Sequence, residues 1–525
     1  MAVGPAPDRQ ETSPPVPSSI GSRGSIGSIT LAIASGAAWG LCHGRVELPW
    51  LAAVALAPLV LLLGRRHPFW LGWLHGTAAW VVSLPWIVHT ITTYGMVPGP
   101  LAALGLLALG AVLGIYRALF AWLAAPVWRR GGAWVYVALP ALWVVAELAR
   151  GRLLTGFPWN LAAYAWTEVP GALPLAAWIG AWGVSALVVA TNIGMARAWS
   201  TRRWEPAAAT LLVVATLLGV GARFAVPPSS GGRPLPVRIV QPDIPDRQIF
   251  DPAASEEDYQ RLLAMTREVC RPGVLVLWPE SASWPHEWQD DPRLEENVRA
   301  LATAGCDVLL NSAFTRSGHT YNAVLLVGAP PRTPPLQMTA KRHLVPFGEY
   351  VPLERLLPFA GKIARFVGEF TPGHGVELLA WNGARIGVAV CYEIVFPGLV
   401  ADLVRQGATL LVTVTNDGWY GDSAAPRQHL RAARFRAAEE RRWVLRAALT
   451  GISAAIRPDG SLAGRLDLGR HGVLALDVEG IDSATPFARA PWLVPLLCLV
   501  VGAAAIVIAR RGRGAASRSL ERTSR

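Results

Sequence analysis

Three segments of the sequence place a reactive side chain at or near the end of an apolar run. Residues 274–278 lead to Glu280, residues 387–390 lead to Cys391, and Lys341 lies between them in the chain. A sheet holds the residues at its strand ends in fixed positions, so functional groups are often found there. A cysteine attacks a carbonyl carbon as its thiolate, helped by a carboxylate that takes the thiol proton and a cation that holds negative charge. These residue types therefore predict nucleophilic acyl transfer.

Each of the three residues also has a structural explanation, because chain order alone does not bring them into contact. Cys391 could be a small buried hydrophobic residue. Glu280 and Lys341 could form a structural ion pair or lie at solvated loop ends. Spacing alone favours the structural explanation for Cys391. For Glu280 and Lys341 it does not decide between a structural and a catalytic role.

The other cysteines form no metal-binding pattern. The chain has five cysteines, with no CxxC pair and no Cys/His spacing typical of zinc, so we expect no metal. Cys42 and Cys498 lie in apolar runs and are expected to be inert, whereas Cys270 and Cys306 could be paired or free. GxSxG, Walker A and HExxH motifs are absent from the sequence, which argues against the chemistries that those motifs serve.

The composition is that of a membrane protein joined to a water-facing domain. Hydrophobic residues make up 52% of the chain and charged residues 16%, whereas an average soluble domain has about 25% charged residues. A bilayer crossing takes about 20 helical residues. The alternative is a set of buried helices in a soluble protein. Eight apolar runs are candidate crossings, of which the second and fifth are short: 28–44, 48–63, 69–92, 99–127, 133–149, 172–198, 207–225 and 491–509.

Arginines gather in alternate loops between these runs and in the C-terminal tail, and the chain has a formal net charge of +12. A nucleic-acid-binding surface would instead interleave basic and aromatic residues on one face, so we expect no nucleic-acid partner. Arg150 and Arg152 break the alternation. With the N-terminus in the cytoplasm, the positive-inside rule places on the cytoplasmic side Arg65, Arg66, Arg129, Arg130, Arg197, Arg202, Arg203, Arg510, Arg511 and Arg513.

These patterns divide the chain into five predicted segments. They are a disordered tail (1–27), a membrane domain of about seven transmembrane helices (28–225), an outward-facing domain (226–490), a transmembrane helix (491–509) and a basic cytoplasmic tail (510–525).

Strands and helices alternate in the outward-facing domain, which is typical of an α/β layered structure. We expect the last helix to present a solvated basic face over 431–446, with binding to anionic head groups as the alternative. The predicted strands are 237–241, 274–278, 308–311, 323–327, 386–390 and 410–415, and the predicted helices are 256–269, 292–304 and 429–446.

Three motifs resemble the nitrilase superfamily, whose members use a Glu-Lys-Cys triad: Trp-Pro-Glu-Ser at 278–281, Lys-Arg-His-Leu-Val-Pro-Phe-Gly-Glu at 341–349 and Cys-Tyr-Glu at 391–393. The apolar runs narrow the resemblance to a membrane-embedded branch of this superfamily. Three further segments narrow it in the same way, at 415–423, 428–430 and 450–453. Together these features resemble the bacterial apolipoprotein N-acyltransferases over nearly the whole chain. The resemblance implies a multi-pass α-helical membrane domain joined to a nitrilase-like αββα sandwich over residues 226–490.

The resemblance also implies a role for each matching residue. Glu280 matches the general base, Lys341 the lysine that stabilises the oxyanion, and Cys391 the nucleophile. Glu349 and Glu393 match two acidic residues that support the site.

Two further positions concern the oxyanion and the substrate. The backbone N–H of Tyr392 is expected to act on the oxyanion together with Lys341. Phe250 stands where the family often has Trp, so it either contacts substrate or packs as an ordinary loop residue. Gln241-Pro242-Asp243 departs from the Gln-Gly-Asn that is usual in the family's first strand. Neither departure touches the triad.

The implied reaction has two steps and needs no cofactor. Cys391 takes an acyl chain from a phospholipid, by resemblance phosphatidylethanolamine, and the α-amino group of the N-terminal diacylglyceryl-cysteine of an apolipoprotein then receives it. The implied location is the bacterial cytoplasmic (inner) membrane, with the catalytic domain on the periplasmic side, and we expect a monomer. Two alternatives are a membrane-tethered amidase that acts on a small molecule and a non-enzymatic scaffold with an inactive nitrilase-like domain.

Overall fold

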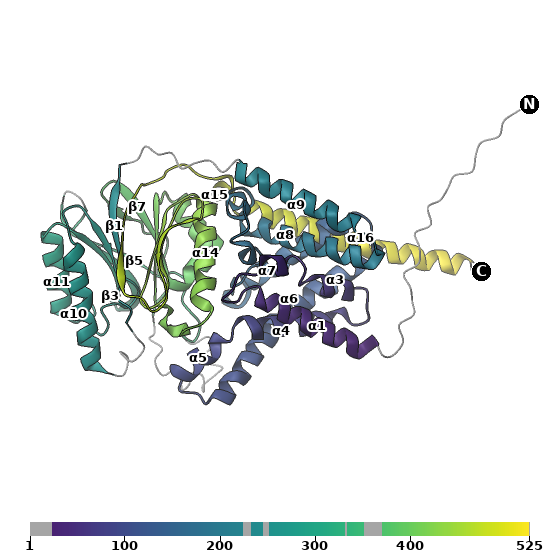
Figure 1. Ribbon diagram of the computed structural model, residues 1–525, viewed down its shortest axis with the longest axis horizontal. Coiled ribbons are helices and arrows are strands. Elements are labelled where there is room, and N and C mark those ends of the chain that lie inside the picture. The colour runs from purple at the N-terminus through teal and green to yellow at the C-terminus, as the bar shows by residue number, and fades with distance from the viewer. Residues whose placement is uncertain (1–23, 224–232, 245–250, 331–332, 351–369, 524–525) are drawn as a thin grey trace, which may run out of the picture.

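The computed structural model describes residues 24–223, 233–244, 251–330, 333–350 and 370–523. Phe250 and residues 1–23 of the predicted tail lie outside the described residues. α1 (Gly24–Leu41) already includes the last four residues of that tail, and α16 (Leu493–Thr523) continues through the predicted basic tail. A helical domain and an α/β domain lie side by side (Figure 1).

The helical domain consists of apolar helices of very different lengths. In the described parts of the chain, three are long and apolar enough to cross a membrane: α6 (Gly99–Arg130), α8 (Ala172–Thr201) and α9 (Glu205–Arg223). α4 (Pro68–Ser83) and α5 (Trp86–Thr93) would add a fourth crossing as a pair bent by 62°. Because the other apolar helices are shorter, eight crossings stay a prediction. These shorter helices are α1, α2 (Pro49–Ala52), α3 (Ala57–Leu62), α7 (Val135–Arg150) and the apolar part of α16.

The run predicted at 48–63 illustrates the difference between composition and length. It forms two short helices, α2 and α3, each with a proline in its first turn. An α-helix rises 1.5 Å per residue, so even a continuous helix over Pro49–Leu62 would span about 20 Å. The hydrocarbon core of a bilayer is about 30 Å thick. This segment is therefore apolar enough for a membrane but too short to cross it as a straight helix.

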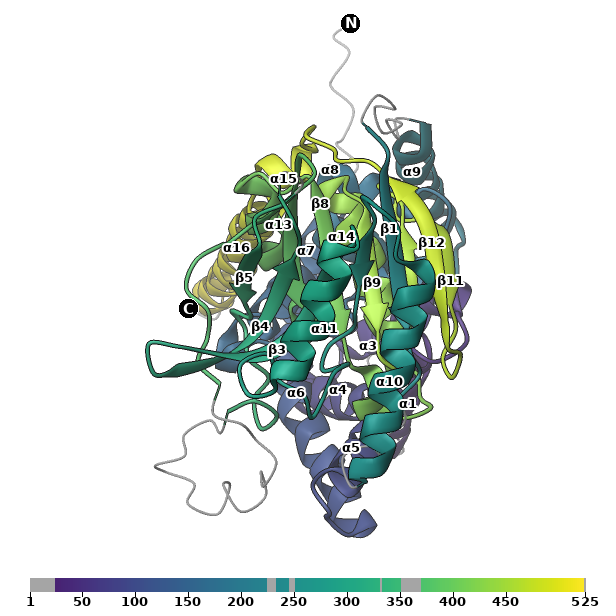
Figure 2. The same ribbon diagram turned by 90° about the vertical axis from the view of Figure 1, so that its left-hand side faces the viewer.

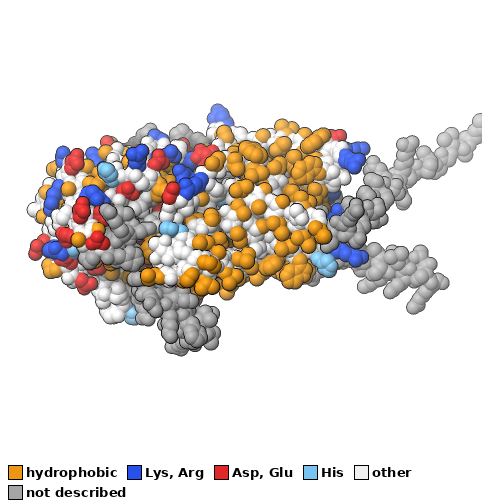
Figure 3. Space-filling view, turned by 60° about the horizontal axis from the view of Figure 1, so that its bottom comes forward, with side chains coloured by type: hydrophobic (Ala, Val, Ile, Leu, Met, Phe, Trp, Pro, Cys, Tyr) orange, Lys and Arg blue, Asp and Glu red, His pale blue; other side chains and the backbone are white. Residues whose placement is uncertain are grey.

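Hydrophobic side chains cover the outside of the helical domain. Leu104 on α6 is 59% exposed, and Leu212 on α9 is 70% exposed. Acidic and basic side chains instead gather on the α/β domain (Figure 3). Soluble proteins rarely expose contiguous apolar patches larger than a few hundred Å². The surface therefore identifies the helical part as a membrane domain.

The α/β domain contains two mixed sheets, each six-stranded within the described residues. The first has the order β12-β1-β2-β3-β4-β5 and the second the order β11-β10-β9-β8-β7-β6. The first sheet is made of β1 (Leu235–Gln241), β2 (Leu275–Leu277), β3 (Asp307–Arg316), β4 (His319–Val327), β5 (Leu336–Ala340) and β12 (Gly472–Val478). The second is made of β6 (Leu379–Trp381), β7 (Ala384–Val390), β8 (Leu410–Thr415), β9 (Val444–Ala448), β10 (Ser453–Ile456) and β11 (Leu462–Leu466).

Helices cover the outer face of each sheet, so the domain is the predicted αββα sandwich. α10 (Pro252–Val269) and α11 (Pro292–Thr303) lie across the first sheet (Figure 2). α14 (Ala425–Glu440) covers the second sheet on the side of the membrane domain (Figure 1), and α13 (Pro397–Arg405) packs against β7 and α14. Side chains from both sheets, such as Leu277 and Val412, fill the core between them. The sheets thus form a rigid frame, and α14 connects it to the membrane domain.

Two predictions about the last helix are wrong. The helix ends at Glu440 because Arg441 adopts the left-handed conformation, with φ 51°, and β9 follows where the helix was expected to continue. Its basic face is not solvated, since Arg431, Arg434 and Arg436 are at most 8% exposed. α14 packs against α8 as well as the second sheet, so both of its sides are covered.

The strands that the sequence did not indicate are mostly short or half exposed. β5 and β6 have five and three residues. β11 alternates between half-buried and exposed residues, and it lies at the edge of its sheet. Such segments lack the continuous apolar run that revealed β7 and β8.

Cys270 and Cys306 form a disulfide bond. Cys270 directly follows α10, and Cys306 directly precedes β3. The bond therefore ties an outer helix of the first sheet to one of its central strands. The sequence left open whether these two cysteines are paired or free, and in the structure they are paired.

Candidate active site

Strand ends from both sheets carry the three predicted triad residues. Glu280 lies shortly after β2 and Lys341 directly after β5 in the first sheet, whereas Cys391 directly follows β7 in the second. Cys391 has φ +52°, a left-handed conformation that is uncommon for residues other than glycine. The structure brings the three residues together: Lys341 Nζ lies 3.6 Å from Oε1 of Glu280, and the charges of both residues act on the Cys391 thiol.

Lys341 lies between two carboxylates. Its Nζ atom is 2.9 Å from Oε1 of Glu349 and 3.6 Å from Oε1 of Glu280, and its side chain is almost fully buried. Burial alone lowers the pKa of Lys341, but the two carboxylates outweigh it and hold the pKa above its ordinary value. The ammonium therefore stays charged at neutral pH and is available to stabilise negative charge on a substrate oxygen.

Asn322 connects the two carboxylates and was not predicted from the sequence. It lies on β4, and its Nδ2 donates to Oε1 of Glu280 at 3.2 Å and to Oε1 of Glu349 at 2.7 Å. The other oxygen of Glu280 accepts from the backbone N–H of Asn416 at 3.0 Å. These donors fix the Glu280 carboxylate. The only sequence signal for Asn322 is a polar residue at the start of the apolar run 323–327.

Cys391 is a thiol in this arrangement. Burial raises its pKa, the Glu280 carboxylate raises it further, and Lys341 lowers it in part, with a net rise above the ordinary value. The Thr415 hydroxyl, at the end of β8, lies 3.3 Å from Cys391 Sγ. A thiol of this kind needs a base during attack, and Glu280 is the carboxylate whose charge acts most strongly on it.

Glu393 supports the site through the backbone. Its Oε1 accepts from the N–H groups of Arg342 and His343 at 2.7 and 2.9 Å, and its Oε2 accepts from Val390 at 2.7 Å. The side chain is 1% exposed. Glu393 therefore clamps the segment after Lys341 to the strand that ends at the nucleophile, and the prediction of a supporting role fits this geometry.

Tyr392 directs its side chain into the membrane domain. Its hydroxyl donates to the Gly156 carbonyl at 3.1 Å, and its ring stacks with Trp159 and makes an edge contact with Phe396. Only its backbone N–H, adjacent to Cys391, remains for the predicted contact with the oxyanion. The side chain instead joins the nucleophile segment to the loop that follows α7.

Gln428 on α14 is a second residue that sequence reasoning missed, although it begins the Gln-His-Leu motif. Its Oε1 accepts from the indole N–H groups of Trp159 and Trp86 at 2.7 and 3.2 Å. Its Nε2 donates to the carbonyls of His43 and Ser83 at 2.7 and 2.8 Å. One buried amide thus holds four groups of the membrane domain, which lie between residues 43 and 159 of the chain.

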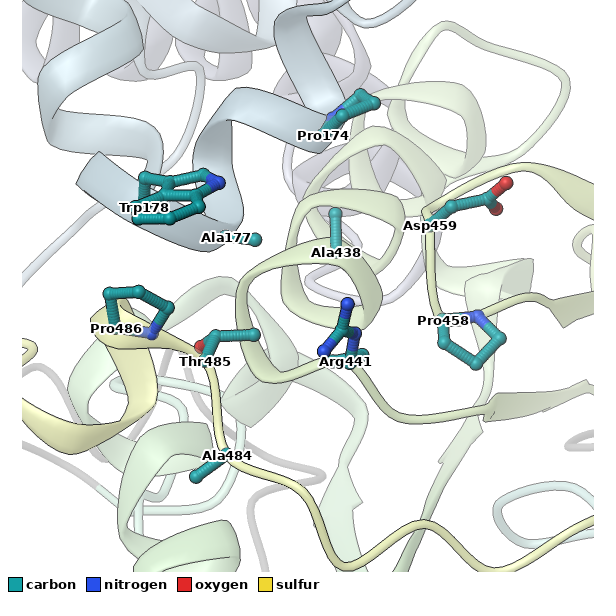
Figure 4. Close-up of a pocket in the computed structure, with 10 residues that line it drawn as sticks. All are labelled: Pro174, Ala177, Trp178, Ala438, Arg441, Pro458, Asp459, Ala484, Thr485 and Pro486. Atoms are coloured by element: carbon teal, nitrogen blue, oxygen red, sulfur yellow. The ribbon is translucent and has the colours of Figure 1, made fainter. Parts of the chain in front are cut away.

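The cavity drawn in Figure 4 lies at the junction of α8, the end of α14 and the loop before β11, and it contains no triad residue. Its charged lining residues are Arg441 and Asp459, beside the exposed indole of Trp178. Across the described residues, no group of three or more His, Cys, Asp or Glu side chains is arranged to hold a metal ion.

Two family models match the chain: the apolipoprotein N-acyltransferase N-terminal domain over residues 35–194 and the carbon-nitrogen hydrolase over residues 237–483. An apolipoprotein N-acyltransferase of Geobacter metallireducens is 36% identical over 473 residues, which cover 86% of this chain and 89% of the relative. One from Azotobacter vinelandii is 34% identical over 519 residues, 93% of this chain and 96% of the relative. The chain belongs to the apolipoprotein N-acyltransferase family.

Membership in the apolipoprotein N-acyltransferases confirms the family and the fold class predicted from the sequence, and it makes the chain an acyltransferase. The carbon-nitrogen hydrolase match coincides with the α/β domain, which is therefore the catalytic domain. A solved CN-hydrolase superfamily protein from Xanthomonas campestris also matches, with a TM-score of 0.36 and 22% identity over 50% of this chain and 97% of that one. The roles of Glu280, Lys341 and Cys391 stay predictions.

The four hydrogen bonds of Gln428 lead to a first prediction. Gln428→Ala leaves two buried indole N–H groups and two buried carbonyls without their partner, and each unsatisfied group costs about 1–3 kcal/mol. We expect the free energy of unfolding to fall by about 3 kcal/mol or more, measured as a lower midpoint of thermal unfolding in detergent.

Gln406→Ala is the matched control, because Gln406 is an exposed residue of the same domain. Exposed substitutions usually change stability by less than about 0.5 kcal/mol, so this variant should unfold like the wild type. Equal midpoints for the Gln428 and Gln406 variants would contradict the role assigned to Gln428.

Proposed function

We propose that this protein moves an acyl chain from a phospholipid to the α-amino group of the N-terminal diacylglyceryl-cysteine of apolipoproteins, through a thioester on Cys391. The observation that carries the proposal is the position of Cys391. Its thiol lies at the end of β7, beside the charged Lys341 and next to a tyrosine that packs into the membrane domain. The curated relatives are named for apolipoproteins, which supports the acceptor.

The first step forms the thioester. Glu280 takes the Sγ proton as the sulfur electron pair forms a bond to the ester carbonyl carbon, and the carbonyl π electrons move to its oxygen. The Lys341 ammonium and the Tyr392 N–H stabilise that oxyanion. When the carbonyl re-forms, the bond to the glycerol oxygen breaks, and Glu280 returns the proton to this oxygen. Lysophospholipid leaves, and the acyl chain remains on Cys391.

In the second step the acceptor amine is the nucleophile and the Cys391 sulfur is the leaving group. The acceptor nitrogen forms a bond to the thioester carbon, and an oxyanion forms again at the same position. The carbon–sulfur bond then breaks with its electron pair on Sγ. Glu280 takes a proton from the amine and passes it to sulfur, which restores the thiol. Donor and acceptor therefore use one site in turn.

Aromatic side chains at the junction of the two domains support an apolar substrate. Trp86 and Tyr420 are in edge contact, with ring centroids 4.7 Å apart, and Trp159 lies 6.1 Å from Tyr420. Trp159 also stacks on Tyr392, the residue next to Cys391, so this aromatic group lies beside the triad. We propose that it faces the acyl chain of a phospholipid, phosphatidylethanolamine by resemblance.

The proposed location is the bacterial inner membrane, with the catalytic domain on the periplasmic side and the protein as a monomer. The Cys270–Cys306 disulfide supports this side of the membrane. Disulfides form and persist in oxidising compartments, of which the bacterial periplasm is one, and they are rare in the cytosol. The arginine-rich loop after α8 supports the same orientation, because it is expected in the cytoplasm.

The orientation can be tested with two reporter insertions. A reporter placed after Arg203 should be active only as a cytoplasmic reporter, and one placed after residue 230 only as a periplasmic reporter. α9, which lies between the two positions, is apolar enough to cross the membrane. Reporters that both read from the same side would refute this orientation.

The two-step order predicts an acyl-enzyme that can be isolated. Purified protein given phospholipid without acceptor should release about one equivalent of lysophospholipid and then stop, and the peptide with Cys391 should gain the mass of one acyl chain. A diacylated lipopeptide with a free α-amine should discharge it, whereas the N-acetylated peptide should not. Cys391→Ala should show neither burst nor acylation. Continuous release of free fatty acid without acceptor would instead indicate a hydrolase.

The electrostatics of the triad predict opposite pH shifts in two variants. Burial and the Glu280 charge raise the pKa of Cys391, and Lys341 lowers it. Glu280→Gln should therefore lower the thiol pKa and move the pH profile of Cys391 alkylation to lower pH, while acyl transfer is lost because the base is gone. Lys341→Met should move the profile to higher pH.

The measurement is the rate of alkylation by a small uncharged reagent between pH 6 and about pH 11, with Cys391→Ala as the blank. Alkylation profiles that shift in the same direction for both variants would contradict the assignment of these two charges to the site.

A further inference from the structure

Thr415 is placed beside the nucleophile by the pairing of two parallel strands. β7 and β8 are hydrogen-bonded neighbours, with Val390 opposite Val414. The next residues along these strands are Cys391 and Thr415, so they leave the same edge of the sheet together. The Thr415 hydroxyl lies 3.3 Å from Cys391 Sγ and 3.1 Å from Oδ1 of Asp417, and the side chain is fully buried.

The hydroxyl has one proton and two neighbours that can accept it. Asp417 is a permanent acceptor: burial raises its pKa, but the paired Arg446 outweighs this and holds the pKa below its ordinary range. Cys391 accepts strongly only as the thiolate. While Cys391 is a thiol, the hydroxyl donates to Asp417. When the thiolate forms, rotation about one C–O bond turns the same proton to sulfur without moving a heavy atom.

The group around Asp417 also fixes the backbone of the nucleophile. Asp417 pairs with Arg446 through Oδ2 and lies 3.1 Å from Nδ1 of His429. Nε2 of His429 is 3.0 Å from the Cys391 carbonyl oxygen, which can only accept, so the nitrogen donates. This bond holds the nucleophile in its left-handed conformation, which costs energy for a residue with a side chain. The hydroxyl and the sulfur are therefore held at a fixed separation.

We propose that Thr415 is a further catalytic residue, whose hydroxyl donates a hydrogen bond to the Cys391 sulfur whenever that sulfur is a thiolate. This inference rests on the proposed function and adds to it. In the first step the bond stabilises the sulfur as Glu280 removes its proton. In the second it stabilises the sulfur as it leaves the tetrahedral intermediate with the electron pair of the carbon–sulfur bond. The Thr415 proton stays on Thr415 throughout.

Three variants test this role. Thr415→Val keeps the shape and removes the hydroxyl, and Thr415→Ser keeps the hydroxyl. Thr413→Val is the matched control, because Thr413 is equally buried two residues earlier on β8 and its hydroxyl has no hydrogen-bond partner among the described residues. The readouts are the rate of the lysophospholipid burst and the pH profile of Cys391 alkylation.

We expect Thr415→Val to slow the burst by about 10- to 100-fold, the range for a hydrogen bond to a charged group. Its alkylation profile should move to higher pH by about one to two units. Thr415→Ser should recover most of the lost rate, and Thr413→Val should match the wild type in both readouts.

A slow Thr415→Val variant with an unchanged alkylation profile would overturn the inference, because a purely structural role alters rate and stability but not the affinity of sulfur for its proton. Failure of Thr415→Ser to recover rate would overturn it as well. The proposed function is tested separately by acylation of wild-type Cys391, which Thr415→Val should still show after long incubation.

Discussion

The burial of α14 between the second sheet and α8 is the constraint on which the rest of the structure depends. A helix with both sides covered is stabilised wherever a polar side chain on it finds a partner, because an unpaired buried polar group is costly. Gln428 does so with four groups of the membrane domain, and Arg434 pairs with Glu168. The catalytic domain is therefore not a free module on a tether. Its orientation relative to the membrane domain is set by directional hydrogen bonds.

The other end of α14 uses a break in a membrane helix. Gly180 interrupts α8 with φ +65°, and a side chain there would collide with Phe487. The break leaves a backbone N–H without a helical partner, and Glu439 accepts it, at 2.6 Å from the nitrogen of Ala181. Glu439 in turn pairs with Arg436 on the same helix. The backbone N–H that the kink in α8 exposes is thus satisfied by a side chain of α14.

In the triad, a buried charge is likewise paired with buried groups of opposite charge. A buried ammonium is stable only beside buried carboxylates, and Lys341 has Glu349 at contact distance and Glu280 slightly farther away. Glu349 is thereby the nearer counter-ion of Lys341, and Glu280 is held less closely to the ammonium, which suits the proposed role of Glu280 as the base for Cys391. Asn322 holds both carboxylates in this unequal arrangement. The difference between the two glutamates is one of position, since they are identical in chemistry.

The sequence by itself determined the features that are encoded locally. Apolar runs marked the membrane domain and the central strands, and the motifs around Glu280, Lys341 and Cys391 marked the family and predicted the triad. Only the tertiary structure decided which groups meet from distant parts of the chain: the Cys270–Cys306 bond, Asn322 between two carboxylates, and Thr415 beside the sulfur. The same holds for α14, whose arginines suggest a solvated face because residue type cannot reveal what covers a helix. Burial is a property of neighbours, and in this fold those neighbours lie up to several hundred residues away.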